Sequence, residues 1–158
     1  MDPRQMAELH RNRARRHYED GQIKDAVIEL EQAIHNDPRD ADAWQMLAEI
    51  YGAAGYVEQA ASYIQKCLQE NYQNIDGWVM LANLYAQLGG PYLDLALQQL
   101  DLAMSLDDNN ANAHYLRGNI LAQKGQSESA VASLNKALSL APDHPFAKHD
   151  LEALKARA

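Results

Sequence analysis

The sequence predicts an all-α fold built from a repeated pair of helices. Short side-chain patterns recur at spacings of 34 to 36 residues, which indicates internal repetition. Alanine, leucine and glutamine are abundant, whereas Phe146 is the only phenylalanine, and this bias favours helix over sheet. The 8 glycines and 5 prolines are widely spaced, so helices can run between them.

The first helix of each unit is predicted from a stripe of residues at positions i, i+3, i+4 and i+7. The clearest copies are WQMLAEIY at 44–51 and WVMLANLY at 78–85, in which Trp, Leu, Ala and Tyr share one helical face. The first and fourth units carry degenerate copies: His10, Arg13, Ala14 and His17, and His114, Arg117, Gly118 and Leu121. Such departures are expected in terminal repeats, because one side of a terminal repeat faces solvent.

The second helix of each unit is predicted from a small residue, a large aliphatic residue four positions on, and a small residue three further on. The four copies are Ala26, Leu30 and Ala33; Ala60, Ile64 and Cys67; Ala96, Leu100 and Ala103; and Ala130, Leu134 and Ala137. Small residues let a neighbouring helix approach closely, and the large residue fills the space between the helices.

The turns are predicted from residues that end or begin helices. Four glycines are expected to end the first helices in a left-handed conformation: Gly21, Gly55, Gly89 and Gly125. Pro38 and Pro142 follow second helices and prevent them from continuing. Asp40, Asn74 and Asn110 are expected to N-cap the first helices of the units that follow.

A unit that reads W-x2-L-A-x2-Y, then G, then A-x3-L-x2-A, then P resembles the tetratricopeptide repeat (TPR). The resemblance covers nearly the whole chain. It implies one domain over residues 1–158, with repeats at 7–40, 41–74, 75–110 and 111–144 and a capping helix at 145–157. It also implies a right-handed α-α superhelix, or solenoid, of antiparallel helix pairs whose first helices line a concave groove.

TPR arrays usually bind peptides or partner proteins, so the resemblance implies a non-catalytic scaffold or adaptor with a protein or peptide ligand in the groove. Helical phase places ten candidate side chains on the groove: Arg11, Arg15, Gln45, Met46, Glu49, Val79, Met80, Asn83, Tyr115 and Asn119. In TPR proteins the slot of Asn83 and Asn119 often holds an asparagine that clamps an extended peptide backbone. An amide suits this role because it offers both a donor and an acceptor.

Three other roles stay open. The Gly-Gly expansion in LGGPYLDLAL, at 88–97, resembles a region of the bacterial TPR subunits that present apocytochrome during cytochrome c maturation. Size and acidity also fit an acidic TPR chaperone of secretion systems. The third role is a self-assembling scaffold, in which an arginine-rich first helix docks on the acidic middle of another copy. That helix holds Arg4, Arg11, Arg13, Arg15 and Arg16, whereas Lys66 is the only Lys or Arg between Asp40 and Asn110, against ten acids.

A TPR class that binds C-terminal carboxylates is not expected. Those co-chaperones use two lysines, an arginine and two asparagines on three successive repeats. Arg11 could replace the first lysine, but Asp76 and Met80 stand where the last lysine and the arginine should be. An acidic residue beside a carboxylate is repulsive.

The residues predict no enzyme, cofactor or metal site. The sequence has no Gly-rich phosphate loop, no H-E-x-x-H and no nucleophile elbow. His10 and His17 would lie about 10 Å apart along one helix, too far to share a metal ion. Cys67 is the only cysteine, so it cannot form an internal disulfide. A net charge of −8 makes general nucleic-acid binding unexpected.

The sequence leaves the compartment unknown. No stretch approaches the ~20 apolar residues of a membrane span, and residues 1–16 lack the apolar run of a secretory signal. These features favour a cytoplasmic location without direct membrane insertion. A periplasmic or membrane-anchored parent protein stays open if the chain is an excised domain.

Overall fold

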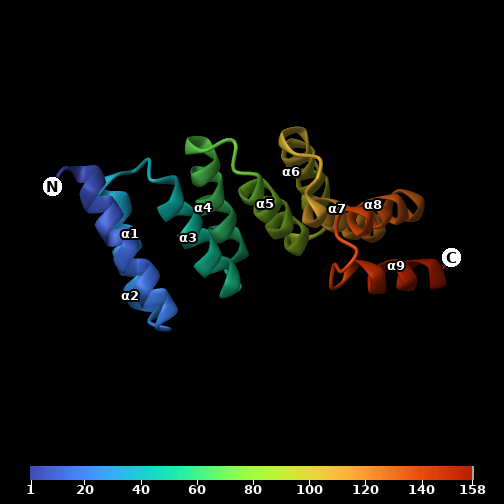
Figure 1. Ribbon diagram of the computed structural model, residues 1–158, viewed down its shortest axis with the longest axis horizontal. Coiled ribbons are helices and arrows are strands. Elements are labelled where there is room, and N and C mark those ends of the chain that lie inside the picture. Colours follow the sequence, from blue (N-terminus) through green and yellow to red (C-terminus); the bar gives the residue numbers. More distant parts are fainter. Residues whose placement is uncertain (158) are drawn as a thin grey trace. The chain divides into compact units, whose positions relative to one another are not determined.

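A computed structural model describes residues 1–157 as helices joined by short turns (Figure 1). The helices are α1 (Pro3–Glu19), α2 (Ile23–Asn36), α3 (Ala41–Ala53), α4 (Val57–Glu70), α5 (Ile75–Leu88), α6 (Tyr92–Leu106), α7 (Ala111–Gln123), α8 (Ser127–Leu140) and α9 (Ala147–Ala156). No strand is present in residues 1–157, which confirms the all-α class.

The helices divide into two compact units, and each is described by itself. Unit 1 runs from Met1 to Gly77 and contains α1 to α4 and the first residues of α5, and unit 2 begins at Trp78 and ends with α9. The predicted capping helix corresponds to α9, which begins two residues later than 145. The single domain over 1–158 stays a prediction.

Within a repeat the chain reverses because a glycine ends the first helix. Gly21 has a φ of +75°, and the N–H of Gln22 donates to the carbonyl oxygen of His17 at 2.7 Å, which closes the turn. The predicted equivalents, Gly55, Gly89 and Gly125, also have positive φ. In the third repeat Gly90 has a φ of +51° as well, so two consecutive left-handed residues accommodate the insertion.

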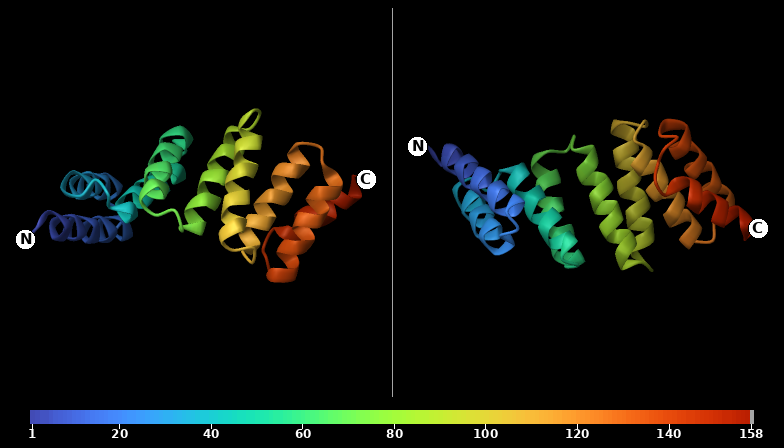
Figure 2. Two further views of the ribbon diagram at one scale, coloured as in Figure 1. Left: turned by 90° about the horizontal axis from the view of Figure 1, so that it is seen from above. Right: turned by 60° about the horizontal axis from the view of Figure 1, so that its bottom comes forward.

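The core of each unit is built from the predicted small-large-small pattern. Its large residues, Leu30, Ile64, Leu100 and Leu134, are at most 1% exposed. Gly118 on α7 shows how closely paired helices approach, because an added Cβ would lie 2.8 Å from Leu134 Cγ on α8. Both views of Figure 2 show α7, α8 and α9 side by side.

Trp44 on α3 organises an aromatic cluster in unit 1. Its Nε1 donates to the carbonyl oxygen of Pro38 at 2.9 Å, and its ring stacks on Tyr63 with centroids 5.9 Å apart. Lys66 Nζ lies 5.1 Å from the centre of the same ring. The one cation of the acidic middle is therefore engaged by Trp44 through a cation–π contact.

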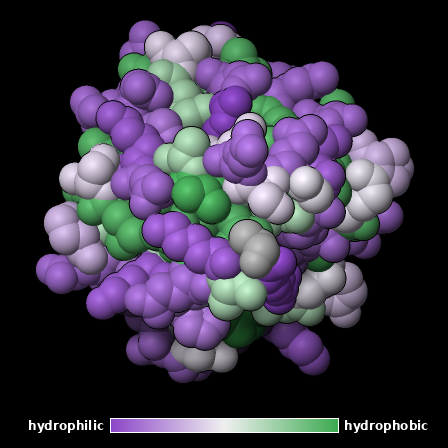
Figure 3. All heavy atoms as spheres, turned by 90° about the vertical axis from the view of Figure 1, so that its right-hand side faces the viewer, coloured by the Kyte–Doolittle hydropathy of each residue, from purple (hydrophilic) through white to green (hydrophobic). Residues whose placement is uncertain are grey.

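The last helix, α9, packs against α8 and α7. Ala147 and Leu151 of α9 are buried, while Lys148 and Glu152 are exposed. Figure 3 shows the end of the molecule near the C-terminus, where apolar residues form small areas between hydrophilic ones. Among the described helices, none has the length and apolar character needed to cross a bilayer.

Candidate functional site

Polar side chains cap the first helices of the repeats and define the surroundings of the predicted groove residues. The side-chain oxygens of Asp40, Asn74 and Asn110 accept the backbone N–H three residues ahead, at 3.1, 2.9 and 3.0 Å. These three predicted N-caps are confirmed. His144 lies three residues before the start of α9, and its Nδ1 likewise accepts the N–H of the residue three positions ahead, Ala147, at 3.2 Å.

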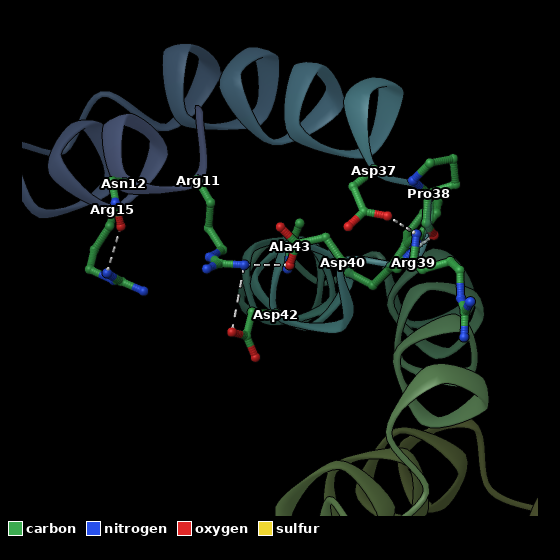
Figure 4. Close-up of polar contacts among 10 residues, drawn as sticks. Arg11, Asn12, Arg15, Asp37, Pro38, Arg39, Asp40, Asp42 and Ala43 are labelled. Atoms are coloured by element: carbon green, nitrogen blue, oxygen red, sulfur yellow. Dashed lines mark hydrogen bonds and ion pairs between the residues drawn. The ribbon is translucent and has the colours of Figure 1, made fainter. Parts of the chain in front are cut away.

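Arg11, a predicted groove residue, is bound by the N-cap of the following repeat (Figure 4). Its Nη1 donates to Asp40 Oδ1 at 2.6 Å and lies 3.6 Å from Asp42 Oδ2. The Asp40 side chain is only 6% exposed, so solvent screens this pair little. Within residues 1–157, Arg11 Nε is buried without a hydrogen-bond partner. Arg11 therefore joins the first and second repeats.

Gln45 plays the same joining role one repeat later. Its Oε1 accepts from Asn74 Nδ2 at 2.7 Å, and its Nε2 donates to Glu49 Oε1 at 2.9 Å. Glu49 is exposed, whereas Met46 is half-buried and packs against the core of unit 1. Arg15 faces solvent, and its one hydrogen bond within the described residues is to Asn12 at 3.3 Å. In unit 1, Arg15 and Glu49 are thus the most accessible predicted residues.

In unit 2, Tyr115 is held by α9. Its hydroxyl donates to Asp150 Oδ2 at 2.7 Å, and its ring lies 4.4 Å from that of His144. Burial raises the pKa of Tyr115, and the hydrogen bond to Asp150 raises it further. Burial also pushes the pKa of Asp150 upward, but hydrogen bonds from Tyr115 and His149 outweigh this and hold that pKa below its ordinary value.

The remaining predicted residues of unit 2 differ in accessibility. Val79 and Met80 are half-buried, and Val79 packs against the core. Asn83 is exposed, and its side chain forms no hydrogen bond within residues 1–157. Asn119 is half-buried and lines a hollow of about 350 Å³ between α7, α8 and α9, and its side-chain hydrogen bonds act to lower the pKa of Tyr115 and of Asp150. Its lining is Asn119, Ala122, Gln123, Leu134, Asp150, Ala153, Leu154 and Arg157.

A single spacing relates three of the predicted residues to their partners in the next repeat. Arg11 meets Asp40 and Gln45 meets Asn74, each 29 positions ahead. Tyr115 meets His144 at the same separation. Sequence reasoning missed these capping residues as part of the surface, although the offset of 29 residues could have found them; the insertion lengthens it to 31 between Val79 and Asn110. The fourth residue of this slot, Val79, has no polar group to offer.

Within the described residues no cluster of His, Cys, Asp or Glu is arranged to hold a metal ion. Cys67 is buried, and burial raises the pKa of its thiol. Neither observation assigns a catalytic group to the surface.

Comparison with known protein families places the repeats independently. Models of the tetratricopeptide repeat match residues 7–50, 41–74 and 111–144. Among curated proteins, no significant sequence match is found.

Solved structures match over most of the chain. MamA from Desulfovibrio magneticus RS-1 is 20% identical, with 96% of this chain and 85% of that chain covered and a TM-score of 0.86. TTC0263, a thermophilic TPR protein in Thermus thermophilus, is 25% identical, with 96% and 82% covered and a TM-score of 0.74. The first TPR domain of Spaghetti (RPAP3), bound to the HSP90 peptide SRMEEVD, is 20% identical, with 77% and 94% covered and a TM-score of 0.70.

Proposed function

Because the chain belongs to the tetratricopeptide repeat family, we propose that it is a non-catalytic module that binds an extended peptide of a partner protein. Its repeats and its structural relatives support a protein–protein interaction role. The binding of an extended peptide is proposed because Asn83 on α5 is an exposed amide with no hydrogen-bond partner within the described residues. Such an amide can pair with both the N–H and the C=O of a peptide.

Asn119 extends the proposed surface on α7. The hollow beside it is lined by the amides of Asn119 and Gln123, by the charged Asp150 and Arg157, and by apolar residues that include Ala122, Leu134 and Leu154. A peptide side chain of moderate size would bury apolar area there while the amides hold its backbone. This division of roles favours a peptide with a small apolar residue between backbone contacts.

An acidic C-terminal ligand is not proposed. The Spaghetti domain was solved with an HSP90 peptide, which shows that a related fold accommodates such a ligand. In this chain, however, Arg11 is already paired with Asp40 and lies near Asp42. A further carboxylate beside Arg11 would be repelled by these two acids.

The proposal is tested with extended 12-residue peptides selected by phage display on the full chain. Asn83→Ala/Asn119→Ala should weaken the selected peptides at least tenfold, or about 1.4 kcal/mol. The matched control is Asn71→Ala/Asn109→Ala, which removes two exposed amides outside α5 and α7. Circular dichroism checks that helicity is kept. Equal affinity of the two double variants would show that the groove assignment is wrong.

Self-assembly is a second candidate, because α1 presents free cations. Arg4, Arg13 and Arg16 are exposed and form no ion pair within residues 1–157. Light scattering at 20 and 500 mM NaCl tests whether they hold an acidic surface of another copy, since salt screens exposed charges. A monomeric mass at low salt rejects it. The apocytochrome-presenting and secretion-chaperone roles rest on the sequence alone and stay predictions.

A further inference from the structure

A second hollow lies in unit 1, between α2 and the end of α3. Its volume is about 380 Å³, and its apolar lining includes Ile23, Val27, Ile28, Tyr51, Ala54 and Tyr56. Ile28 is 55% exposed and Tyr56 is 57% exposed. Two large side chains of one lining, each with more than half of its surface in water, are thus available to a partner.

This surface is separate from the predicted groove. An α-helix turns about 100° per residue, so Ala54 is about 180° around the axis of α3 from Gln45. Gln45 and Glu49 therefore face one side of the helix, while Tyr51 and Ala54 face the other. A partner on the hollow would leave the groove residues free.

The two exposed apolar residues have polar equivalents in unit 2. Alignment of the repeats on Ala26 and Ala96 places Gln98 at the position of Ile28. Alignment on Ala60 and Ala130 places Gln126 at the position of Tyr56. The same helix pair thus folds with glutamine at both positions, so the repeat does not require the apolar residues.

In unit 2 a side-chain bridge joins two of the equivalent positions. Lys124 Nζ donates to Asp94 Oδ1 at 2.6 Å, which lays the aliphatic stem of the lysine across the surface between α6 and α7. The equivalent positions in unit 1 hold Ala54 and Lys24. Alanine cannot reach across, and Lys24 is the one charged residue in the lining and has no ion-pair partner within the described residues.

We propose that this surface of unit 1 docks an amphipathic helix of a partner protein, with apolar side chains in the hollow and a carboxylate on Lys24. In unit 2 the two equivalent positions carry a paired lysine and aspartate. In unit 1 the position of the aspartate holds Lys24 and the position of the lysine holds Ala54, so this surface presents a cation without an acid, and we expect the partner to supply the acid. The volume falls within the usual range of binding sites, about 300–1,000 Å³. Apolar residues one turn apart on such a helix would contact Ile28 and Tyr56.

The test uses a phage-displayed library of 16-residue helical peptides, selected on the immobilised full chain. Soluble Ile28→Gln/Tyr56→Gln is added in excess as competitor, so peptides that bind the groove are removed. Both glutamines are taken from unit 2, so the fold should be kept, and circular dichroism confirms it. A second variant, Lys24→Asp/Ala54→Lys, places the Asp94–Lys124 pair of unit 2 at the equivalent positions of unit 1. It keeps the test possible if Ile28→Gln/Tyr56→Gln is destabilised.

The expected result is enrichment of peptides with apolar residues three or four apart and a neighbouring Glu or Asp. Synthetic copies should bind both double variants at least tenfold more weakly than the original chain, and Asn83→Ala/Asn119→Ala equally well. Lys24→Asp alone should prefer a peptide with Lys in place of the acid. The proposal is overturned if no peptide is enriched, if the double variants bind equally, or if the acid is dispensable.

Discussion

In unit 1, Arg11 forms an ion pair with Asp40, the N-cap of the next repeat. In unit 2, the neutral side chain of Tyr115 contacts the ring of His144 just before α9 and donates a hydrogen bond to Asp150 on α9. Arg11 and Tyr115 occupy equivalent positions in the first helices of their repeats. A position that faces the predicted groove can therefore serve to join one repeat to the next. Side chains elsewhere in the groove, such as Asn83, are then left for a ligand.

Substitutions in the two cores should cause the largest losses of stability. They also test whether the two units unfold separately. Leu30→Ala in unit 1 and Leu134→Ala in unit 2 should each cost about 2–5 kcal/mol of unfolding free energy, because both side chains are fully enclosed. Urea denaturation measures this cost.

If the units behave as neighbouring repeats, Leu30→Ala should speed labelling of the buried Cys67 thiol, while amides of α7 and α8 keep their hydrogen-exchange protection. Equal loss of protection in both units would contradict that separation.

Breaking the Arg11–Asp40 contact between repeats of unit 1 should cost more unfolding free energy than breaking the Tyr115–Asp150 contact of unit 2. Asp40→Ala removes an N-cap and the main partner of a largely buried arginine, so we expect a loss of about 2–3 kcal/mol. Asp40→Asn keeps the cap, as Asn74 does in the next repeat, and should lose about half as much. Urea denaturation of both variants measures the difference. Equal losses would mean that the ion pair, not the cap, carries the whole effect.

The junction of unit 2 should depend less on its hydrogen bond. Tyr115→Phe keeps the ring contact with His144 and removes only the hydroxyl that donates to Asp150, so about 0.5–1.5 kcal/mol is expected. Hydrogen exchange should rise chiefly in α9. Tyr18→Phe, on an exposed tyrosine of unit 1, is the matched control. A loss as large as that of Asp40→Ala would reverse the comparison.

The smallest effect is a pH dependence confined to unit 2. The pKa of Asp150 is held below its ordinary value in the folded chain. Its contribution is therefore present above the unfolded value, about pH 3.9, and is lost as the pH falls through the folded value. Asp150 is one third exposed, so less than about 1 kcal/mol is expected. Thermal unfolding of the chain and of Asp150→Asn should differ by a constant amount above pH 5 and converge below pH 4.

Local spacing was enough to predict the helices, their turns and their core. Gly21 and Asp40 act within four residues of their own positions, so a short stretch of sequence determines what they do. Leu30 needs only a helical period and small neighbours to be assigned to the core. The degenerate fourth copy has a structural reason: His114 Nε2 donates to the carbonyl oxygen of Asp108 at 2.8 Å, as Trp44 Nε1 does to Pro38.

Spacing could not predict whether the side chain of each groove residue is free or bound to a neighbouring repeat. Helical phase says which way Arg11 points, but its pairing with Asp40 depends on how the next repeat packs. The same holds for Tyr115, whose partner Asp150 lies 35 residues ahead on α9. The hollow near Ile28 needed a comparison of repeats in three dimensions, because a single exposed isoleucine is common in soluble proteins.

The central claim is that one slot of the first helices joins repeats while Asn83 and Asn119 hold a peptide. The most direct test is the dissociation constant of one display-selected extended peptide for three chains: the original, Asn83→Ala/Asn119→Ala and Arg11→Gln. The last variant copies the residue that repeat 2 uses in the joining slot, Gln45. We predict at least tenfold weaker binding for the asparagine variant and less than a twofold change for Arg11→Gln. Loss of binding with Arg11→Gln and none with the asparagine variant would contradict the account.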